Sequence, residues 1–103
     1  MKYFFLISVL FCTSLAAQQT EYDLARVAYF SGRYEEALNG IQHCIDLDTA
    51  NYQYLFLKGR TLENLYRYDE AIATQHKALR LNTNSIEART ALAALYLLSG
   101  QPN

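Results

Sequence analysis

The sequence has little that would divide it into separate segments. Its single proline is Pro102, at the end of the 103 residues. Residues 18–103 contain no low-complexity stretch, no linker, and no apolar run of the roughly 20 residues that a membrane-spanning helix needs. Strict alternation of polar and apolar residues, which is typical of half-buried strands, is absent as well. This part of the chain is therefore predicted to be helical, without linkers or membrane spans.

Charge is also scarce and nearly balanced. Charged residues make up 18% of the chain, hydrophobic residues make up 51%, and the formal net charge is −1. This composition is typical of a globular chain rather than a disordered one, and the length allows one domain. A net charge so near zero gives no electrostatic reason to expect nucleic acid or an anionic membrane surface as a partner.

The first 17 residues differ in composition from the rest. Residues 1–2 give a positive start, residues 3–12 are almost wholly apolar, and residues 13–17 are mostly small. This order is typical of a secretory signal peptide, and we expect cleavage after Ala16 or Ala17. The sequence therefore predicts an exported protein of the bacterial periplasm or cell envelope.

Two other interpretations of this leader are weaker. An uncleaved membrane anchor needs a longer apolar run, which Thr13 and Ser14 interrupt. A lipoprotein attached through Cys12 would have a small residue before that cysteine, but bulky Phe11 stands there. Once the leader is removed, Cys44 is the only cysteine, so no internal disulfide can form and we expect a buried thiol.

One long segment occurs twice in the chain. Residues 34–51 (YEEALNGIQHCIDLDTAN) return as residues 68–85 (YDEAIATQHKALRLNTNS). An offset of about 34 residues is typical of helix–turn–helix repeats. The same offset aligns Ala25 with Gly59 and Ala93, so one register is kept across three copies. The chain is therefore predicted to be a repeat protein.

Five helices follow from the apolar spacing and from the residues at the helix ends. The first is expected from about Thr20, whose hydroxyl can cap it together with Asp23, to Gly32. Asn84 and Glu87 fit a capping box for the fifth helix. The other helices are expected at 34–47, 52–66, 69–81 and 86–99. The residues predicted to be buried are Leu24, Ala25, Ala28, Tyr29, Ala37, Leu38, Ile41, Cys44, Ile45, Leu55, Gly59, Leu62, Ala71, Ile72, Ala78, Leu79, Leu92, Ala93 and Tyr96.

No combination of residues in the sequence is typical of an active site. The carboxylate pairs at 35–36 and 69–70 begin helices, where negative charge complements the helix dipole. The pair His43–Cys44 and the distant His76 lack the spacing of zinc ligands. Residues 46–48 resemble the start of a calcium loop but lack its later glycine and glutamate. Serine-nucleophile and phosphate-binding glycine motifs are absent, so we predict a protein that is not an enzyme and has no cofactor or metal.

The repeated residues resemble the tetratricopeptide repeat. That pattern has a small residue in the first helix, a glycine and a tyrosine at the hairpin turn, and two alanines in the second helix. The matching residues are Ala25, Gly59 and Ala93, then Gly32 and Gly100, then Tyr34 and Tyr68, then Ala37 with Cys44 and Ala71 with Ala78. The resemblance implies an all-α fold of stacked antiparallel hairpins after the leader at 1–17. Its repeats would lie at about 18–51 and 52–85, with an incomplete third repeat at 86–103.

A few positions depart from this pattern. Tyr66 stands where the second unit would have its turn glycine, and Lys58 stands where a leucine is expected. Thr49 and Thr83 replace the usual proline at the end of each unit. These changes are expected to weaken the turn of the second hairpin without altering the fold.

The resemblance also implies a binding surface. In such proteins the first helices line a concave groove, which usually binds an extended peptide. The groove positions here are Gln19, Tyr22, Arg26, Tyr29, Phe30, Gln53, Phe56, Arg60, Glu63, Asn64, Thr90, Ala94 and Leu97. The main candidates are Tyr22, Arg26, Tyr29, Phe30, Phe56, Arg60 and Glu63, because aromatic residues and arginine dominate interface energetics.

Two arginines in this set lie one repeat apart. Arg26 and Arg60 could lie one above the other and hold a carboxylate between them. The alternative is that Arg60 and Arg67 only flank Glu63 as exposed ion pairs. The Lys/Asn carboxylate clamp of chaperone-binding members is missing, so a heat-shock chaperone tail is not the expected ligand. The clamp positions hold Tyr22, Arg26, Leu57, Glu87 and Ala91.

Two functions fit the sequence. The first is an exported, non-catalytic module that binds a protein or an extended peptide. The alternative is the N-terminal segment of a larger exported enzyme or signalling protein, because the third unit is incomplete and repeat arrays need a polar capping helix. Leu92, Leu95 and Leu98 are expected to form an uncovered apolar face through which the chain could self-associate.

Overall fold

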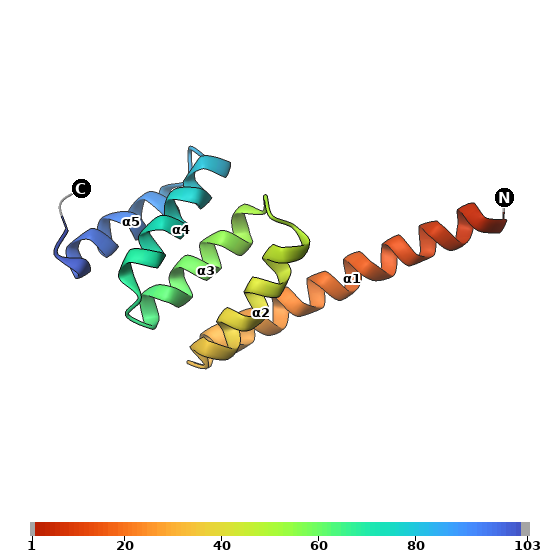
Figure 1. Cartoon of the computed structure of the whole chain (residues 1–103), viewed down its shortest axis with the longest axis horizontal. Coiled ribbons are helices and arrows are strands. Elements are labelled where there is room, and N and C mark those ends of the chain that lie inside the picture. The colour runs from red at the N-terminus through yellow and green to blue at the C-terminus, as the bar shows by residue number, and fades with distance from the viewer. Residues whose placement is uncertain (1, 102–103) are drawn as a thin grey trace.

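The computed structural model describes residues 2–101, with side chains from residue 15 onward. This range contains no strand, and its helices are α1 Lys2–Phe30, α2 Tyr34–Leu47, α3 Tyr52–Asn64, α4 Tyr68–Leu81 and α5 Ile86–Ser99. Figure 1 shows α1 with α2 and α3 with α4 as antiparallel hairpins stacked side by side, followed by α5 against α4. The predicted all-α class and the stacking of hairpins are confirmed.

The two sides of the stack differ in how closely their helices approach. Helix α3 contacts both α1 and α5, whereas no comparable contact joins α2 to α4 in the part of the chain that is described. The helices α1, α3 and α5 therefore form the tighter, inner side of a curved array. The helices α2 and α4 form the outer side, which faces the viewer in Figure 1.

Helix α1 is longer than the sequence suggested. The predicted start at Thr20 is wrong, because the helix already includes Lys2 and the hydroxyl of Thr20 donates to the carbonyl of Ala16 at 2.9 Å. No glycine or proline interrupts residues 2–30, so nothing in the sequence stops the helix before its turn at Gly32. Within residues 2–101, no helix has both the length and the apolar character needed to cross a membrane.

The two hairpin turns have the same geometry although their residues differ. Gly32 has a φ of 80°, and Tyr66, one repeat later, has a φ of 63°. The amide of Arg33 donates to Ala28 O and the amide of Arg67 donates to Leu62 O, each at 2.9 Å, as in a helix ending with a left-handed residue. The second repeat therefore makes the turn with a tyrosine, and α3 ends at Asn64 rather than at the predicted residue 66.

The cap of α5 is also shifted from the prediction. The capping residue is Ser85 rather than Asn84, and its hydroxyl oxygen accepts a hydrogen bond of 3.1 Å from the amide of Ala88. Glu87 receives a hydrogen bond from the Ser85 hydroxyl at 3.2 Å. At the other end, Gly100 has a φ of 72° and ends α5 as predicted.

The small residues pack where the hairpin helices meet. Ala37 and Ala71 are fully buried. Ala25 lies so close to Gly40 that a Cβ added to Gly40 would be only 3.3 Å from the Cβ of Ala25. Gly59 lies directly against Gln75, and a Cβ added there would collide with the amide. The predicted close approach of the two helices is confirmed in both complete hairpins.

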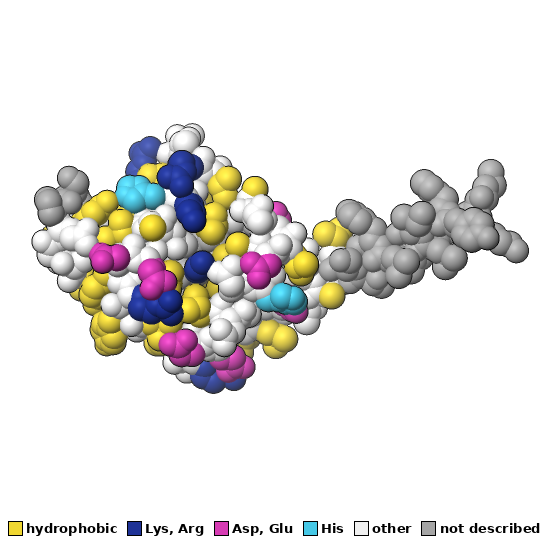
Figure 2. Space-filling view, in the orientation of Figure 1, with side chains coloured by type: hydrophobic (Ala, Val, Ile, Leu, Met, Phe, Trp, Pro, Cys, Tyr) yellow, Lys and Arg dark blue, Asp and Glu magenta, His cyan; other side chains and the backbone are white. Residues whose placement is uncertain are grey.

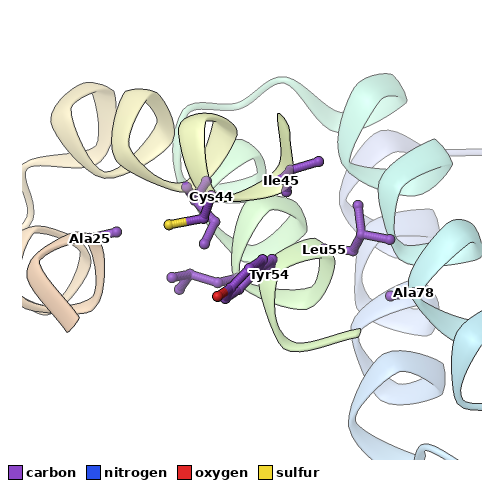
Figure 3. Packing of buried hydrophobic residues seen from close by; sticks show 8 residues of the cluster. Ala25, Cys44, Ile45, Tyr54, Leu55 and Ala78 are labelled. Carbon is purple, nitrogen blue, oxygen red and sulfur yellow. The ribbon is translucent and has the colours of Figure 1, made fainter. Parts of the chain in front are cut away.

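The core consists of two hydrophobic clusters rather than one. Figure 3 shows the first, in which Cys44 and Tyr54 point toward α1 while Leu55 points toward α4. The second cluster joins α3, α4 and α5. Leu38 packs against both clusters and so connects them. Cys44 is fully buried with a free thiol, as predicted.

Most of the predicted buried residues are buried, and two are not. Leu24 is 63% exposed and Ala93 is exposed, because neither faces a helix in the described residues. Leu92 and Leu95 were expected on an uncovered face, but both are buried against α3 and α4, and only Leu98 is exposed. The open side of α5 instead presents Ile86, Thr90, Ala93 and Leu97. Tyr29, Leu38, Leu79 and Tyr96 are half-buried.

Candidate functional site

A groove of about 580 Å³ lies between α1 and α3 on the inner side of the array. Its lining residues from α1 are Gln19, Tyr22, Arg26, Tyr29 and Phe30, and those from α3 are Tyr52, Gln53, Phe56, Leu57 and Arg60. These residues meet because the inner helices of successive repeats contact one another, so equivalent faces of α1 and α3 come together. The groove contains several aromatic rings and two arginines, and none of its lining residues is an aspartate or a glutamate.

The structure brings together six of the seven main candidates. Glu63 does not line the groove. Its Oε1 forms an ion pair with Nη1 of Arg60, a lining residue, at 3.2 Å. The alternative prediction is confirmed for Arg60, which pairs with Glu63, and is wrong for Arg67, which pairs with Glu70 at 2.8 Å. Helix α5 supplies no lining residue, so the predicted positions Thr90, Ala94 and Leu97 lie outside this groove.

Two lining residues were missed by the sequence reasoning. Tyr52 stacks on Phe56 with ring centroids 5.8 Å apart and an interplanar angle of 19°. The spacing of four residues in a helix was a signal for this pair, because such residues lie on one face. Leu57 is buried beneath the groove and contributes to its floor.

The aromatic rings of α1 are held by contacts with α3 and with each other. Tyr22 packs against Tyr54 with centroids 5.1 Å apart. Tyr29 meets Phe30 edge to face at 5.2 Å, and its hydroxyl accepts a hydrogen bond of 3.4 Å from the Asn64 amide. These contacts position the rings before any ligand arrives, which reduces the entropy that binding would cost.

Arg26 keeps its charge available to the groove, whereas Arg60 is already paired with Glu63. Arg26 lies over the ring of Tyr22, with its Cζ 5.8 Å from the centroid, and its nearest carboxylate is that of Asp23 at 3.9 Å. Burial raises the pKa of Tyr22 and outweighs the opposite effect of Arg26. The phenol therefore stays protonated at neutral pH and can donate a hydrogen bond beside the guanidinium.

The histidines make polar contacts between helices at the surface, and the cysteine is buried in the core. His43 Nδ1 lies 2.8 Å from Glu21 Oε2, and His76 Nε2 lies 2.9 Å from the hydroxyl of Tyr96. Burial raises the pKa of the Cys44 thiol, with Glu21 adding to the effect. Among the residues whose side chains are described, no three His, Cys, Asp or Glu residues cluster closely enough to hold a metal ion.

A comparison with protein families finds a match over part of the chain. A tetratricopeptide repeat model matches residues 52–85, which span α3, α4 and the turns that follow them. No curated protein matches the sequence. The matched segment carries Gly59, Ala71 and Ala78, three of the residues on which the resemblance was based.

Solved structures share the fold at low sequence identity. The type III secretion translocator chaperone SycD from Yersinia enterocolitica superposes with a TM-score of 0.80 at 23% identity, over 84% of this chain and 65% of that one. A structure of SycD with a peptide of the translocator YopD gives the same score and identity, over 84% and 66%. MamA from AMB-1 gives 0.76 at 26% identity, over 82% and 46%. The chain thus spans about half to two thirds of the length of these proteins, and the likeness shows the fold.

Proposed function

We propose that the chain is a non-catalytic interaction module that binds an extended segment of a partner protein in the groove between α1 and α3. The observation that carries this proposal is the groove itself, where ordered aromatic rings surround two arginines. Rings buried at low entropic cost and arginines that form bidentate hydrogen bonds are the residue types that supply most interface energy.

The groove chemistry favours one kind of segment. Its apolar area suits aromatic or branched side chains of the partner, which would pack on Tyr22 and Phe56. Arg26 and Arg60 suit a carboxylate, either an acidic side chain or a free C-terminus. The chaperone SycD, which shares the fold, has been seen with a bound peptide, and this supports a similar use of the fold here.

Export is a further part of the proposal. Its support is the order of charge, apolar residues and small residues within residues 1–17. The test is to express the chain in a bacterium, purify it from the periplasmic fraction and weigh it by mass spectrometry. A mass that corresponds to a start at residue 17 or 18 supports export, and a full-length protein that stays in the cytoplasm contradicts it.

Binding is tested with a defined probe. A library of random dodecapeptides displayed on phage is selected on the purified protein, and the enriched peptide is synthesised and titrated by fluorescence anisotropy. The double variant Arg26→Ala/Arg60→Ala is expected to weaken the peptide about tenfold or more, which corresponds to at least about 1.4 kcal/mol.

The chain provides a matched control for this experiment. Arg33 and Arg67 also lie one repeat apart, and each pairs with a carboxylate three residues away, as Arg26 and Arg60 do, but neither lines the groove. The double variant Arg33→Ala/Arg67→Ala removes the same charge and should change the dissociation constant less than twofold. Equal losses in both double variants, or no enriched peptide at all, would contradict groove binding.

A further inference from the structure

A second pocket lies on the outer side of the array, away from the groove. Its volume is about 390 Å³, and its lining residues are Gln42, Ile45 and Thr49, then Leu55 and Lys58, then Thr74, Lys77, Arg80 and Leu81. Three of these residues are basic and none is acidic. Figure 2 shows Lys and Arg side chains gathered over the part of this face where α4 lies.

Lys58 occupies a position that the repeat fills with leucine. The repeat offset aligns Lys58 with Leu24 and Leu92, and Leu92 is buried. Lys58 is half-buried, and desolvation, helped by the nearby charge of Lys77, lowers its pKa. Placing an ammonium group there costs stability unless another group compensates its charge.

No lining residue of the pocket supplies a negative charge to neutralise the ammonium group of Lys58. The Nζ of Lys58 donates to the Oε1 of Gln42 at 2.7 Å, and this acceptor is neutral. The carboxylates that influence Lys58 from a distance are Glu70, which is paired with Arg67, and Asp46, which binds the amide nitrogen of Gln42. Neither Glu70 nor Asp46 lines the pocket.

Four other arginines of the protein behave differently. An ion pair with a carboxylate three residues away is formed by each of Arg26, Arg33, Arg60 and Arg67. Within the described residues, Lys58, Lys77 and Arg80 form no ion pair, although they border the same pocket. Three cations thus border one cavity whose lining residues include no carboxylate, and such an arrangement suits a small anion of multiple charge.

We propose that this outer pocket binds a phosphate-type oxyanion. Lys58 would hold it from the floor, and Lys77 and Arg80 would hold it from α4. Thr49 also lines the pocket, and its hydroxyl could donate to the anion. The ligand is either free phosphate or a phosphoryl group on a partner, since both present the same oxygens to these residues. The outer pocket shares no lining residue with the groove, so this proposal does not depend on peptide binding in the groove.

The test is calorimetric titration of the purified protein at fixed ionic strength with three probes: inorganic phosphate, O-phosphoserine and acetate. Saturable binding of phosphate or phosphoserine, with acetate at least tenfold weaker, supports the site. Tighter binding of phosphoserine assigns the site to a modified partner, and tighter binding of phosphate assigns it to the free ion. Acetate binding as tight as phosphate, or no saturable binding of either phosphate probe, overturns the proposal.

Variants locate the binding to this pocket. Lys77→Gln/Arg80→Gln changes two exposed side chains, which leaves the fold intact, and should weaken phosphate at least tenfold. Lys58→Leu restores the residue type of the repeat and should abolish saturable binding while the protein stays folded by circular dichroism. The matched control Arg33→Gln removes one exposed positive charge elsewhere and should leave the affinity unchanged. Unchanged affinity in the double variant would overturn the assignment.

Discussion

The side-chain amide of Gln75 on α4 donates a hydrogen bond of 3.1 Å to the main-chain carbonyl of Phe56, a groove residue on α3. Gln75 is fully buried, and its Oε1 finds no hydrogen-bond partner in the described part of the chain. The same side chain fills the space opposite Gly59. A polar residue of the outer helix thus contacts the backbone of the inner helix directly behind the groove.

This relationship leads to a prediction about stability. Gln75→Met keeps the volume but removes the unsatisfied oxygen, whose desolvation costs about 1–3 kcal/mol, so the variant should be more stable than the wild type by about 1 kcal/mol. Gln75→Ala leaves a cavity and should be about 2–5 kcal/mol less stable than Gln75→Met. Urea denaturation followed by circular dichroism measures both. A Met variant as unstable as the Ala variant would show that the amide itself is required.

Ala71 tests the packing of the second hairpin. It is fully buried between the helices, so Ala71→Leu should overpack the contact and cost about 1–3 kcal/mol. Ala73, two residues later on the same helix, is exposed, and Ala73→Leu should change the free energy of unfolding by no more than about 0.5 kcal/mol. The comparison is made by urea denaturation, and equal midpoints for the two variants would contradict this packing.

Tyr66 tests the strain of the second turn. It is the one residue other than glycine with a positive φ in the described chain, and a left-handed conformation costs an ordinary residue about 1–2 kcal/mol. Tyr66→Gly should therefore raise the free energy of unfolding by about 1 kcal/mol, after the larger unfolded-state entropy of glycine is subtracted. Tyr66→Ala keeps the strain and should give no increase in thermal or urea stability. An equal gain in both variants would mean that loss of the tyrosine ring, and not the backbone, is responsible.

The lowered pKa of Lys58 leads to a prediction about how stability depends on pH. Because its pKa is lowered in the folded protein, the unfolded chain binds more protons between that lowered pKa and the ordinary value of about 10.4. The stability contributed by Lys58 therefore rises with pH through this window and is lowest below the lowered pKa. The difference in unfolding free energy between wild type and Lys58→Met should shift in favour of wild type as the pH rises toward 10.5.

The difference in unfolding free energy between wild type and Lys58→Met isolates the titration of Lys58. Burial raises the pKa of Tyr22 and Tyr54, which lowers stability above about pH 10, but both tyrosines are present in the wild type and in the variant. Their effect cancels when the two curves are subtracted. A subtracted curve that stays flat from pH 7 to 10.5 would contradict the lowered pKa of Lys58.

The sequence predicted the repeated elements well because they depend on local spacing. The bounds of α2 and α5, the burial of Ala37 and Ala71, and the left-handed Gly32 all follow from apolar periodicity and from residues that favour helix ends. The groove positions came from the resemblance to the repeat family rather than from periodicity, and the structure places six of the seven main candidates around one groove.

The errors occur where the neighbours of a residue differ between repeats. Leu24 and Ala93 belong to the pattern but face no helix within residues 2–101, so the repeat alone overestimated their burial. Tyr66 adopts the left-handed backbone conformation that glycine has in the first turn, because the hydrogen bonds around it impose that conformation. Gln75 could not be foreseen as buried, because polar residues are rarely fully buried and Ile41 stands at the equivalent position.

The division of α3 into two faces has an evolutionary consequence. Phe56 and Arg60 face the groove, whereas Gly59 and Leu62 face the other helix of the hairpin. Under the proposed function, mutations at the first two positions would alter which partner is recognised while the scaffold that displays them is inherited unchanged. A lineage of such proteins can therefore diversify its partners through a few codons of one helix.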